Sequence, residues 1–214
     1  MSLSTPSAPV SARRLNLISL VLVLGVITTI LDTTIVNIAL DNLHTVFHTT
    51  VADTQWVVTA YLLAYVAVIP VSGWASERFG TRRVWMFALA AFMVGSLLCG
   101  LAWDLPSLIG FRVLQGVGGG MVLPVTLTIL TRAAGRDRIG RAIATIGLVG
   151  QLGPILGPIV GGTIIDSVGW HWLFFVNIPI CLVALVLAPF FLPSGATDRA
   201  HALDTPGSYC SRPA

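Results

Sequence analysis

Residues 27–40 read ITTILDTTIVNIAL, an apolar run that carries one aspartate, Asp32. The run is part of a longer apolar stretch over residues 15–40, which exceeds the roughly 20 residues that a helix needs to cross a bilayer core. Hydrophobic residues make up 55% of the 214 positions and charged residues 10%, so the composition is that of a membrane protein. A carboxylate in such a run is costly, and Asp32 is therefore a candidate functional residue.

Five similar runs follow the first. The six runs lie near residues 15–40, 54–73, 84–103, 106–131, 142–165 and 172–192. We predict an all-α membrane protein in which residues 15–192 form six transmembrane helices, because each run is long enough to span a bilayer. The first run is too long for a secretory signal peptide. The polar arm before it, residues 1–14, is expected to be disordered, and residues 193–214 form a tail.

The arginines predict the orientation of the chain. Eleven of the twelve lie in the N-terminal arm, in the loops after the second and fourth runs, or in the tail, and the other three loops have none. Cytoplasmic segments collect such residues, so we predict a multi-pass protein of the plasma membrane with both termini in the cytoplasm. The arginines form no single patch, which argues against nucleic acid as a partner. The tryptophans at the ends of the runs are predicted to be interfacial anchors: Trp56, Trp74, Trp85, Trp103, Trp170 and Trp172.

The other costly charge is Arg112, inside the fourth run. Asp32 and Arg112 are expected at a similar depth, roughly 12 Å and 9 Å from the outer ends of their helices. Two interpretations remain open: an ion pair that only fixes helix packing, or a carboxylate that titrates and couples proton movement to a conformational cycle. Asn37 is expected to share the side of the helix on which Asp32 lies.

Glycine and proline mark the fifth run, GLVGQLGPILGPIVGG over residues 147–162. Small residues at spacings of three or four let another helix approach closely, and Pro154 and Pro158 free backbone carbonyls and bend a helix. We interpret this run as a specialised bend at an interface between moving parts. The glycines of the fourth run, Gly116, Gly118, Gly119 and Gly120, indicate close packing or room for a substrate.

The segment GWASERFGTRRVW, residues 73–85, is expected to be a tight loop between the second and third helices. Gly73 and Gly80 would supply backbone freedom there. Its charged residues, Glu77, Arg78, Arg82 and Arg83, are interpreted as an ion-pair network that clamps the helix ends in one conformation. The alternative is a basic loop that only sets the topology.

Five segments in this order resemble the major facilitator superfamily, in particular its fourteen-span drug:proton antiporter branch. LDTTIVNIAL resembles the first-helix motif, GWASERFGTRR the loop 2-3 signature, and FRVLQGVGGG the helix 4 motif with Arg112, Gln115 and Gly116. The helix 5 antiporter motif is matched at Gly153, Gly157, Pro158, Gly161 and Gly162, with Pro154 beside it, and GWHWLFFVNIPI resembles the start of helix 6. Departures are Glu77 in place of aspartate, Thr81 in place of a basic residue, and Asp41 in place of proline.

The resemblance implies one N-terminal six-helix bundle with a three-plus-three inverted repeat. It implies proton-coupled efflux of hydrophobic, cationic compounds by alternating access, with Arg112 in proton coupling and Asp32 in proton or substrate handling. Asn37 and Gln115 would line the cavity, and the loop 2-3 charges would act in gating. The expected partners are the lipid bilayer, protons, a small hydrophobic or cationic substrate, and a C-terminal half or dimer partner.

Family members have two six-helix bundles, so we expect this chain to be the N-terminal half, ended before a seventh helix. A non-transporting fragment and a half-transporter that works as a dimer are the alternatives. In a lone bundle, Asp32 and Arg112 would be expected to face lipid. The sequence predicts no enzyme activity, cofactor or metal site, because its histidines and cysteines form no metal-binding or nucleophilic pattern.

Overall fold

The computed structural model describes residues 12–134 and 139–193. The helices of this part of the chain are α1 (Ala12–Val46), α2 (Val51–Phe79), α3 (Thr81–Gly100), α4 (Leu105–Ala134), α5 (Ile139–Val168), the short α6 (Trp172–Phe175) and α7 (Asn177–Phe191). Six segments are long and apolar enough to cross a membrane, and α6 and α7 together make the sixth, Trp172–Phe191. The prediction of six transmembrane helices is confirmed.

Several helices extend further than predicted. α1 has 35 residues, about 52 Å at 1.5 Å per residue, and is therefore longer than a bilayer core is thick. It begins at Ala12, so the last three residues of the expected disordered arm are helical. Residues 1–11 of that arm and residues 194–214 of the tail lie outside the described residues.

The loop expected within residues 73–85, between the second and third helices, is a single residue, Gly80, because α2 runs to Phe79 and α3 starts at Thr81. Gly80 has φ 88°, a conformation that side chains with a Cβ rarely adopt, and its N–H donates to the carbonyl of Ser76. Gly73 lies inside α2 and supplies no turn. The expectation of backbone freedom is thus right for Gly80 and wrong for Gly73.

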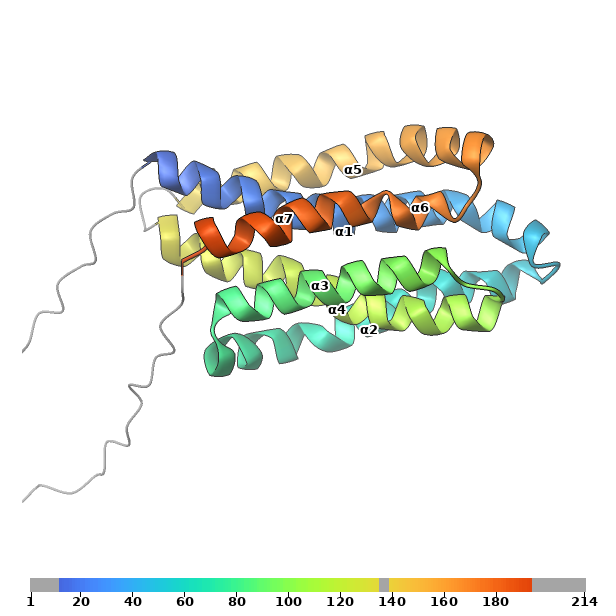
Figure 1. The fold of residues 1–214 in the computed structure, drawn as a ribbon, viewed down its shortest axis with the longest axis horizontal. Helices are drawn as coiled ribbons and strands as arrows, with labels where there is room; N and C mark the ends of the chain where they lie inside the picture. Colours follow the sequence, from blue (N-terminus) through green and yellow to red (C-terminus); the bar gives the residue numbers. More distant parts are fainter. Residues whose placement is uncertain (1–11, 135–138, 194–214) are drawn as a thin grey trace, which may run out of the picture.

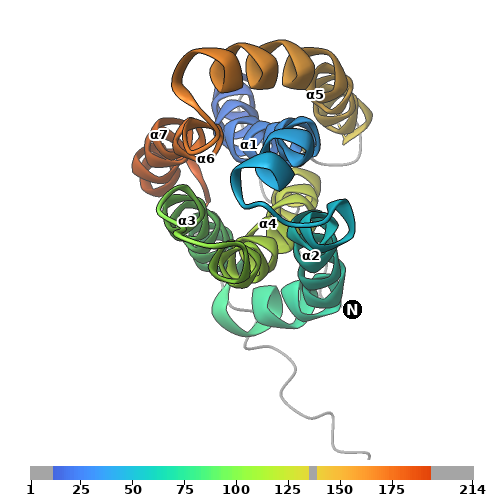
Figure 2. The same ribbon diagram turned by 90° about the vertical axis from the view of Figure 1, so that its right-hand side faces the viewer.

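The helices lie alongside one another in two groups, α1 with α5 and α7, and α2 with α3 and α4 (Figures 1 and 2). α4 packs against both α2 and α3, and α1 packs against α5. The starts of α1, α3 and α5 lie at the same end of the bundle as the ends of α2, α4 and α7 (Figure 1). This up-and-down arrangement follows from the short connections between consecutive helices.

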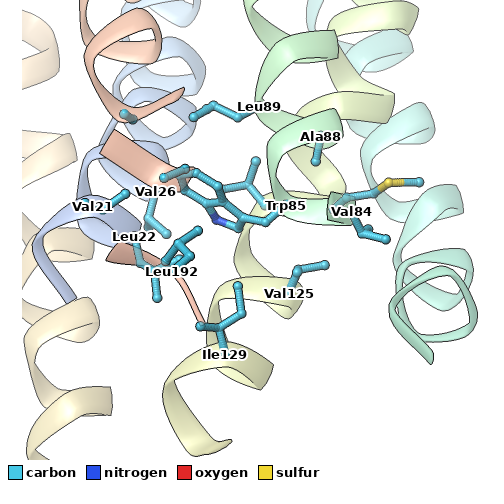
Figure 3. Packing of buried hydrophobic residues seen from close by; sticks show 14 of the residues in the cluster. Val21, Leu22, Val26, Val84, Trp85, Ala88, Leu89, Val125, Ile129 and Leu192 are labelled. Atoms are coloured by element: carbon cyan, nitrogen blue, oxygen red, sulfur yellow. The ribbon is translucent and has the colours of Figure 1, made fainter. Parts of the chain in front are cut away.

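Trp85 lies in the main apolar core, against side chains of α1 and α4 (Figure 3). It is fully buried, and its Nε1 donates a hydrogen bond to Thr126 Oγ1 at 2.9 Å. Trp170 is 5% exposed and belongs to a second core cluster. The prediction that all six tryptophans are interfacial anchors is therefore wrong for Trp85, on a face of α3 that points into the bundle, and for Trp170, in the turn between α5 and α6.

The glycines of α4 bring three helices together. A methyl group on Gly116 would lie 2.5 Å from the carbonyl oxygen of Tyr61 in α2, and a methyl on Gly118 would meet the backbone of Phe92 in α3. A methyl on Gly120 would meet the carbonyl of Tyr65. Of the two interpretations of this run, the structure supports close packing at these positions.

Candidate functional site

Asp32 of α1 and Arg112 of α4 form an ion pair in the middle of the bundle. Arg112 Nη1 donates to Asp32 Oδ2 at 2.6 Å, and the side chains are 1% and 0% exposed. The two charges therefore share a depth, as the sequence predicts. Two charges buried in apolar surroundings need each other and further hydrogen bonds, because an isolated charge there is very costly.

Amide groups complete the contacts of the Asp32 carboxylate. Gln115 Nε2 donates to Oδ1 at 2.8 Å, and Asn177 Nδ2 donates to the same oxygen at 3.1 Å. Gln115 Oε1 accepts from Arg112 Nη1 at 2.7 Å, which closes a ring of hydrogen bonds among Asp32, Arg112 and Gln115. We call these four residues, Asp32, Arg112, Gln115 and Asn177, the buried charge cluster.

The guanidinium of Arg112 is also held by α2. Its Nε donates to the carbonyl oxygen of Val57 at 3.2 Å, and its central carbon lies 4.0 Å from the centroid of the Tyr61 ring. A cation over an aromatic face is attracted by the ring quadrupole. The cluster therefore joins α1, α2, α4 and α7.

Local backbone features bring these side chains together. A methyl group on Gly95 of α3 would lie 2.7 Å from the backbone of Gln115, so this glycine lets α3 and α4 approach closely behind the cluster. Pro179 has no N–H to donate to the carbonyl of Phe175, and the helix is interrupted at Val176 between α6 and α7. Asn177, the first residue of α7, is thereby placed beside Asp32.

The expectation that Asp32 and Arg112 face lipid in a single bundle is wrong. Both are buried within this one bundle, because α2, α4 and α7 close around them. Asn37 is outside the cluster: its side chain is exposed and donates to the carbonyl of Thr33 at 2.7 Å. Gln115 is in the cluster. The expectation that Asn37 shares the side of Asp32 is wrong, because five residues at 100° per residue place the two side chains on different sides of α1.

In the described part of the chain, Glu77 does not take part in the ion-pair network predicted near Gly80. Glu77 is exposed and makes no ion pair with Arg78 or Arg83. Arg78 instead lies over the rings of Trp74 and Phe79, at 5.7 and 5.8 Å from their centroids. Arg82 is half-buried, and Arg83 is exposed.

The glycines of α5 fit against α1. A methyl group on Gly153 would meet Ile30, one on Gly157 would meet Thr34, and one on Gly161 would lie 3.4 Å from Ile35. Pro154 and Pro158 are exposed, and α5 remains one helix across both. Gly162 has open space in front of it and lines a surface pocket of about 280 Å³ between α1 and α5, together with Asp41 and Asp166.

Asn177 was not identified as a site residue from the sequence, nor were Ser96 and Tyr61. The available signal was a polar side chain in an otherwise apolar span, which applies to Asn177 in NIPICLVALVLAPFF and to Ser96 in α3. Tyr61 gives no such signal, because aromatic residues are common in apolar helices.

Comparison with known proteins shows the family of this chain. The family model described as Major Facilitator Superfamily matches residues 22–209. The chain belongs to the major facilitator superfamily. A relative from Mycobacterium tuberculosis named "Multidrug resistance protein B homolog" is 47% identical over 187 residues, which are 87% of this chain and 35% of that protein. The "Putative multidrug resistance protein MdtD" of Salmonella paratyphi B is 36% identical over 187 residues, 87% of this chain and 40% of that protein.

Solved structures of this superfamily share the fold. The proton:xylose symporter XylE superposes with a TM-score of 0.78 at 19% identity, over 87% of this chain and 46% of that one. A bacterial homologue of the lysosomal transporter Spinster, in an inward-facing conformation, gives a TM-score of 0.70 at 18% identity, over 87% and 45%. This superfamily member is thus a multi-pass membrane protein. It spans less than half the length of these relatives, and this share is consistent with the N-terminal six-helix bundle.

Proposed function

We propose that this chain acts in proton-coupled efflux of hydrophobic, cationic compounds, as one of the two six-helix bundles of a transporter that works by alternating access. The names of its relatives support drug efflux as the type of transport. The observation that carries the coupling to protons is the buried ion pair of Asp32 and Arg112, with the carboxylate at 0% exposure.

The proposed coupling starts from the charged pair. When a proton from the medium binds an oxygen of Asp32, the carboxylate becomes neutral and the electrostatic part of its bond to Arg112 is lost. α1 and α4 are then held together less firmly, and the guanidinium must find other acceptors. When the proton leaves on the opposite side of the membrane, the pair forms again. Intramembrane carboxylates serve as proton relays in other pumps and transporters for this reason.

We further propose that the chain resides in the plasma membrane with both termini in the cytoplasm. Arg13, Arg78, Arg83 and Arg132 lie at one end of the bundle, where α1 and α3 begin and α2 and α4 end. Lys and Arg near span ends favour the cytoplasmic side. The charged residues around Gly80 lie at that end, and we propose that they act in gating. We also propose that the glycines of α5 form a contact that shifts against α1.

The test is transport in lipid vesicles. The 214-residue chain is reconstituted alone and together with the C-terminal half of the Mycobacterium tuberculosis relative, and a proton gradient is imposed. We expect movement of a lipophilic cationic dye with the second half present, and we expect Asp32→Asn to abolish it, because an amide cannot take up and release a proton at this site.

The matched control is Asp104→Asn, which makes the same chemical change at an exposed aspartate outside the spans. It should keep dye movement, since asparagine also caps a helix well. Unchanged proton-driven transport by Asp32→Asn would refute the assignment of Asp32. If the chain transports dye alone and crosslinking shows dimers, the second bundle would be a second copy of this chain.

A further inference from the structure

Asn177 is the member of the buried charge cluster with an unused group. Its side chain is 1% exposed, and its Nδ2 donates to Asp32 Oδ1 at 3.1 Å and to Ser96 Oγ at 3.2 Å. Its carbonyl oxygen Oδ1 is buried and has no hydrogen-bond partner among the described residues. A buried acceptor without a partner is rare in proteins and calls for an explanation.

The amide is held in place from two sides. Ser96 Oγ donates to the carbonyl oxygen of Phe174 at 2.9 Å, so the hydroxyl that accepts from Asn177 is itself fixed against α6. Asn177 stands at the first position of α7, next to the interruption at Val176. The contacts therefore link α3 and α7 to the carboxylate on α1.

The neighbours of Asp32 are suited to its charged form. Among the residues that the structure describes, the donors to its oxygens are N–H groups: Arg112 Nη1 and Gln115 Nε2 from α4, and Asn177 Nδ2 from α7. The other titratable groups with an electrostatic interaction with Asp32 are Tyr61 of α2, Cys99 of α3 and Cys181 of α7. α5 meets α1 near Asp32 through glycines, at Ile30 and Thr34.

A protonated Asp32 has a different requirement, because its O–H must donate to an acceptor. Gln115 Oε1 already accepts from Arg112 Nη1 at 2.7 Å and faces Cys99 Sγ at 3.6 Å. Asn177 Oδ1 accepts from none of the described residues, and a half-turn of the amide about its Cβ–Cγ bond exchanges Oδ1 with Nδ2. After that turn, the carbonyl oxygen lies next to both Asp32 and Ser96. The Ser96 hydroxyl then turns from the carbonyl oxygen of Phe174 to donate to Asn177.

We propose that Asn177 is a positioning residue that stabilises Asp32 in both protonation states, as a donor to the carboxylate and, after rotation of its amide, as an acceptor from the acid. The inference rests on the proposed function, in which Asp32 binds and releases a proton. It assigns to α7 a direct part in the proton step, since the orientation of the Asn177 amide reports the protonation of Asp32 to Ser96 and α3.

The test is infrared spectroscopy of the full 214-residue chain in lipid vesicles over a range of pH. The band of the protonated carboxyl that disappears in Asp32→Asn identifies Asp32. Asn177→Leu, which has nearly the same shape, should move the midpoint of this titration to higher pH by about 1 unit, because the lost bond to the charged form is stronger than the lost bond to the neutral form. The carboxyl C=O band should also move to higher frequency in Asn177→Leu, since the acid loses its acceptor.

Ser96→Ala is the second variant, which leaves Asn177 in place and should shift the midpoint in the same direction by less. Asn16→Leu is the matched control at an exposed asparagine of α1 and should cause no shift. An unchanged or lower midpoint in both Asn177→Leu and Ser96→Ala overturns the donor role, and an unchanged C=O frequency in Asn177→Leu overturns the acceptor role. If no band depends on Asp32 in the unmodified chain, the proposed function itself fails, so the two failures are distinct.

Discussion

The buried ion pair should make the effects of two substitutions strongly non-additive. Arg112→Leu leaves the Asp32 carboxylate at 0% exposure without its counter-charge, and Asp32→Asn leaves the Arg112 guanidinium at 1% exposure without one. Removing one partner of a buried pair destabilises a protein by about 3–5 kcal/mol, because the remaining charge is buried and unpaired. Each single variant should lose this amount.

The double variant Asp32→Asn/Arg112→Leu should be more stable than either single variant. It contains no buried unpaired charge, and the side-chain oxygen of the asparagine introduced at position 32 still accepts from Gln115 and Asn177. It loses the ion pair itself, and also the hydrogen bonds of Arg112 to Val57 O at 3.2 Å and to Gln115 Oε1 at 2.7 Å, which Arg112→Leu alone loses as well. Hydrogen bonds to a charged group contribute about 1.5–3 kcal/mol each, and because Arg112→Leu loses the same two bonds, its extra instability is that of the unpaired carboxylate.

The assay is reversible unfolding in mixed detergent micelles, followed by helical circular dichroism. A pH series adds a second readout: the stability lost in Arg112→Leu should shrink as the pH falls, because Asp32 can become neutral, whereas the loss in Asp32→Asn should persist. The control pair is Arg13→Leu with Asp104→Asn, two exposed residues whose effects should add. A double variant as unstable as the sum of the singles would refute the assignment of a buried, mutually dependent pair.

Two further predictions concern the packing and capping of α4. Gly116→Ala should destabilise the bundle by about 1–3 kcal/mol, because its methyl would lie 2.5 Å from the carbonyl oxygen of Tyr61. Gly110→Ala, whose methyl would have nothing within 4 Å, should stabilise α4 by about 0.5–1 kcal/mol. Thermal unfolding compares the two variants, and equal effects would contradict close packing at Gly116. Hydrogen bonds from the hydroxyl and backbone N–H of Ser107 lower the pKa of Asp104. The start of α4 should therefore be protected from hydrogen exchange at a pH above the pKa of this carboxyl in the unfolded chain. It should lose that protection as the pH falls through the lower pKa of the folded chain. Amide hydrogen exchange at Ser107 against pH measures this effect, and Asp104→Asn should remove its pH dependence.

The membrane class and the number of spans could be predicted from the sequence because both depend on local properties. Apolar runs of spanning length must be helical in lipid, where each backbone group has to be satisfied within its own segment. The depth of Asp32 and Arg112 followed from counting residues along two antiparallel helices. The helix ends were less predictable: a polar stretch such as residues 74–79 remains helical beyond an apolar run, because its backbone hydrogen bonds are equally satisfied in water.

The candidate site was only partly predictable. Asp32, Arg112 and Gln115 were identified, but Asn37 was placed with them and Asn177 was not. Asn37 is close to Asp32 in sequence and yet turned away from it, whereas Asn177 is 145 residues away and within 3.1 Å of it. The buried positions of Trp85 and Trp170 were missed for a related reason, since a tryptophan near the end of a span can face either the interface or a neighbouring helix.

The sequence alone determined that this chain crosses a membrane six times and carries two opposite charges at one depth, because hydropathy and helical rise act along a single segment. Tertiary structure decided which faces of the helices meet, that the two charges are sealed inside one bundle, and that an amide from α7 completes their contacts. Those outcomes depend on close approach at Gly95 and Gly116 and on the interruption before Asn177, and so on the packing of helices that are distant in sequence.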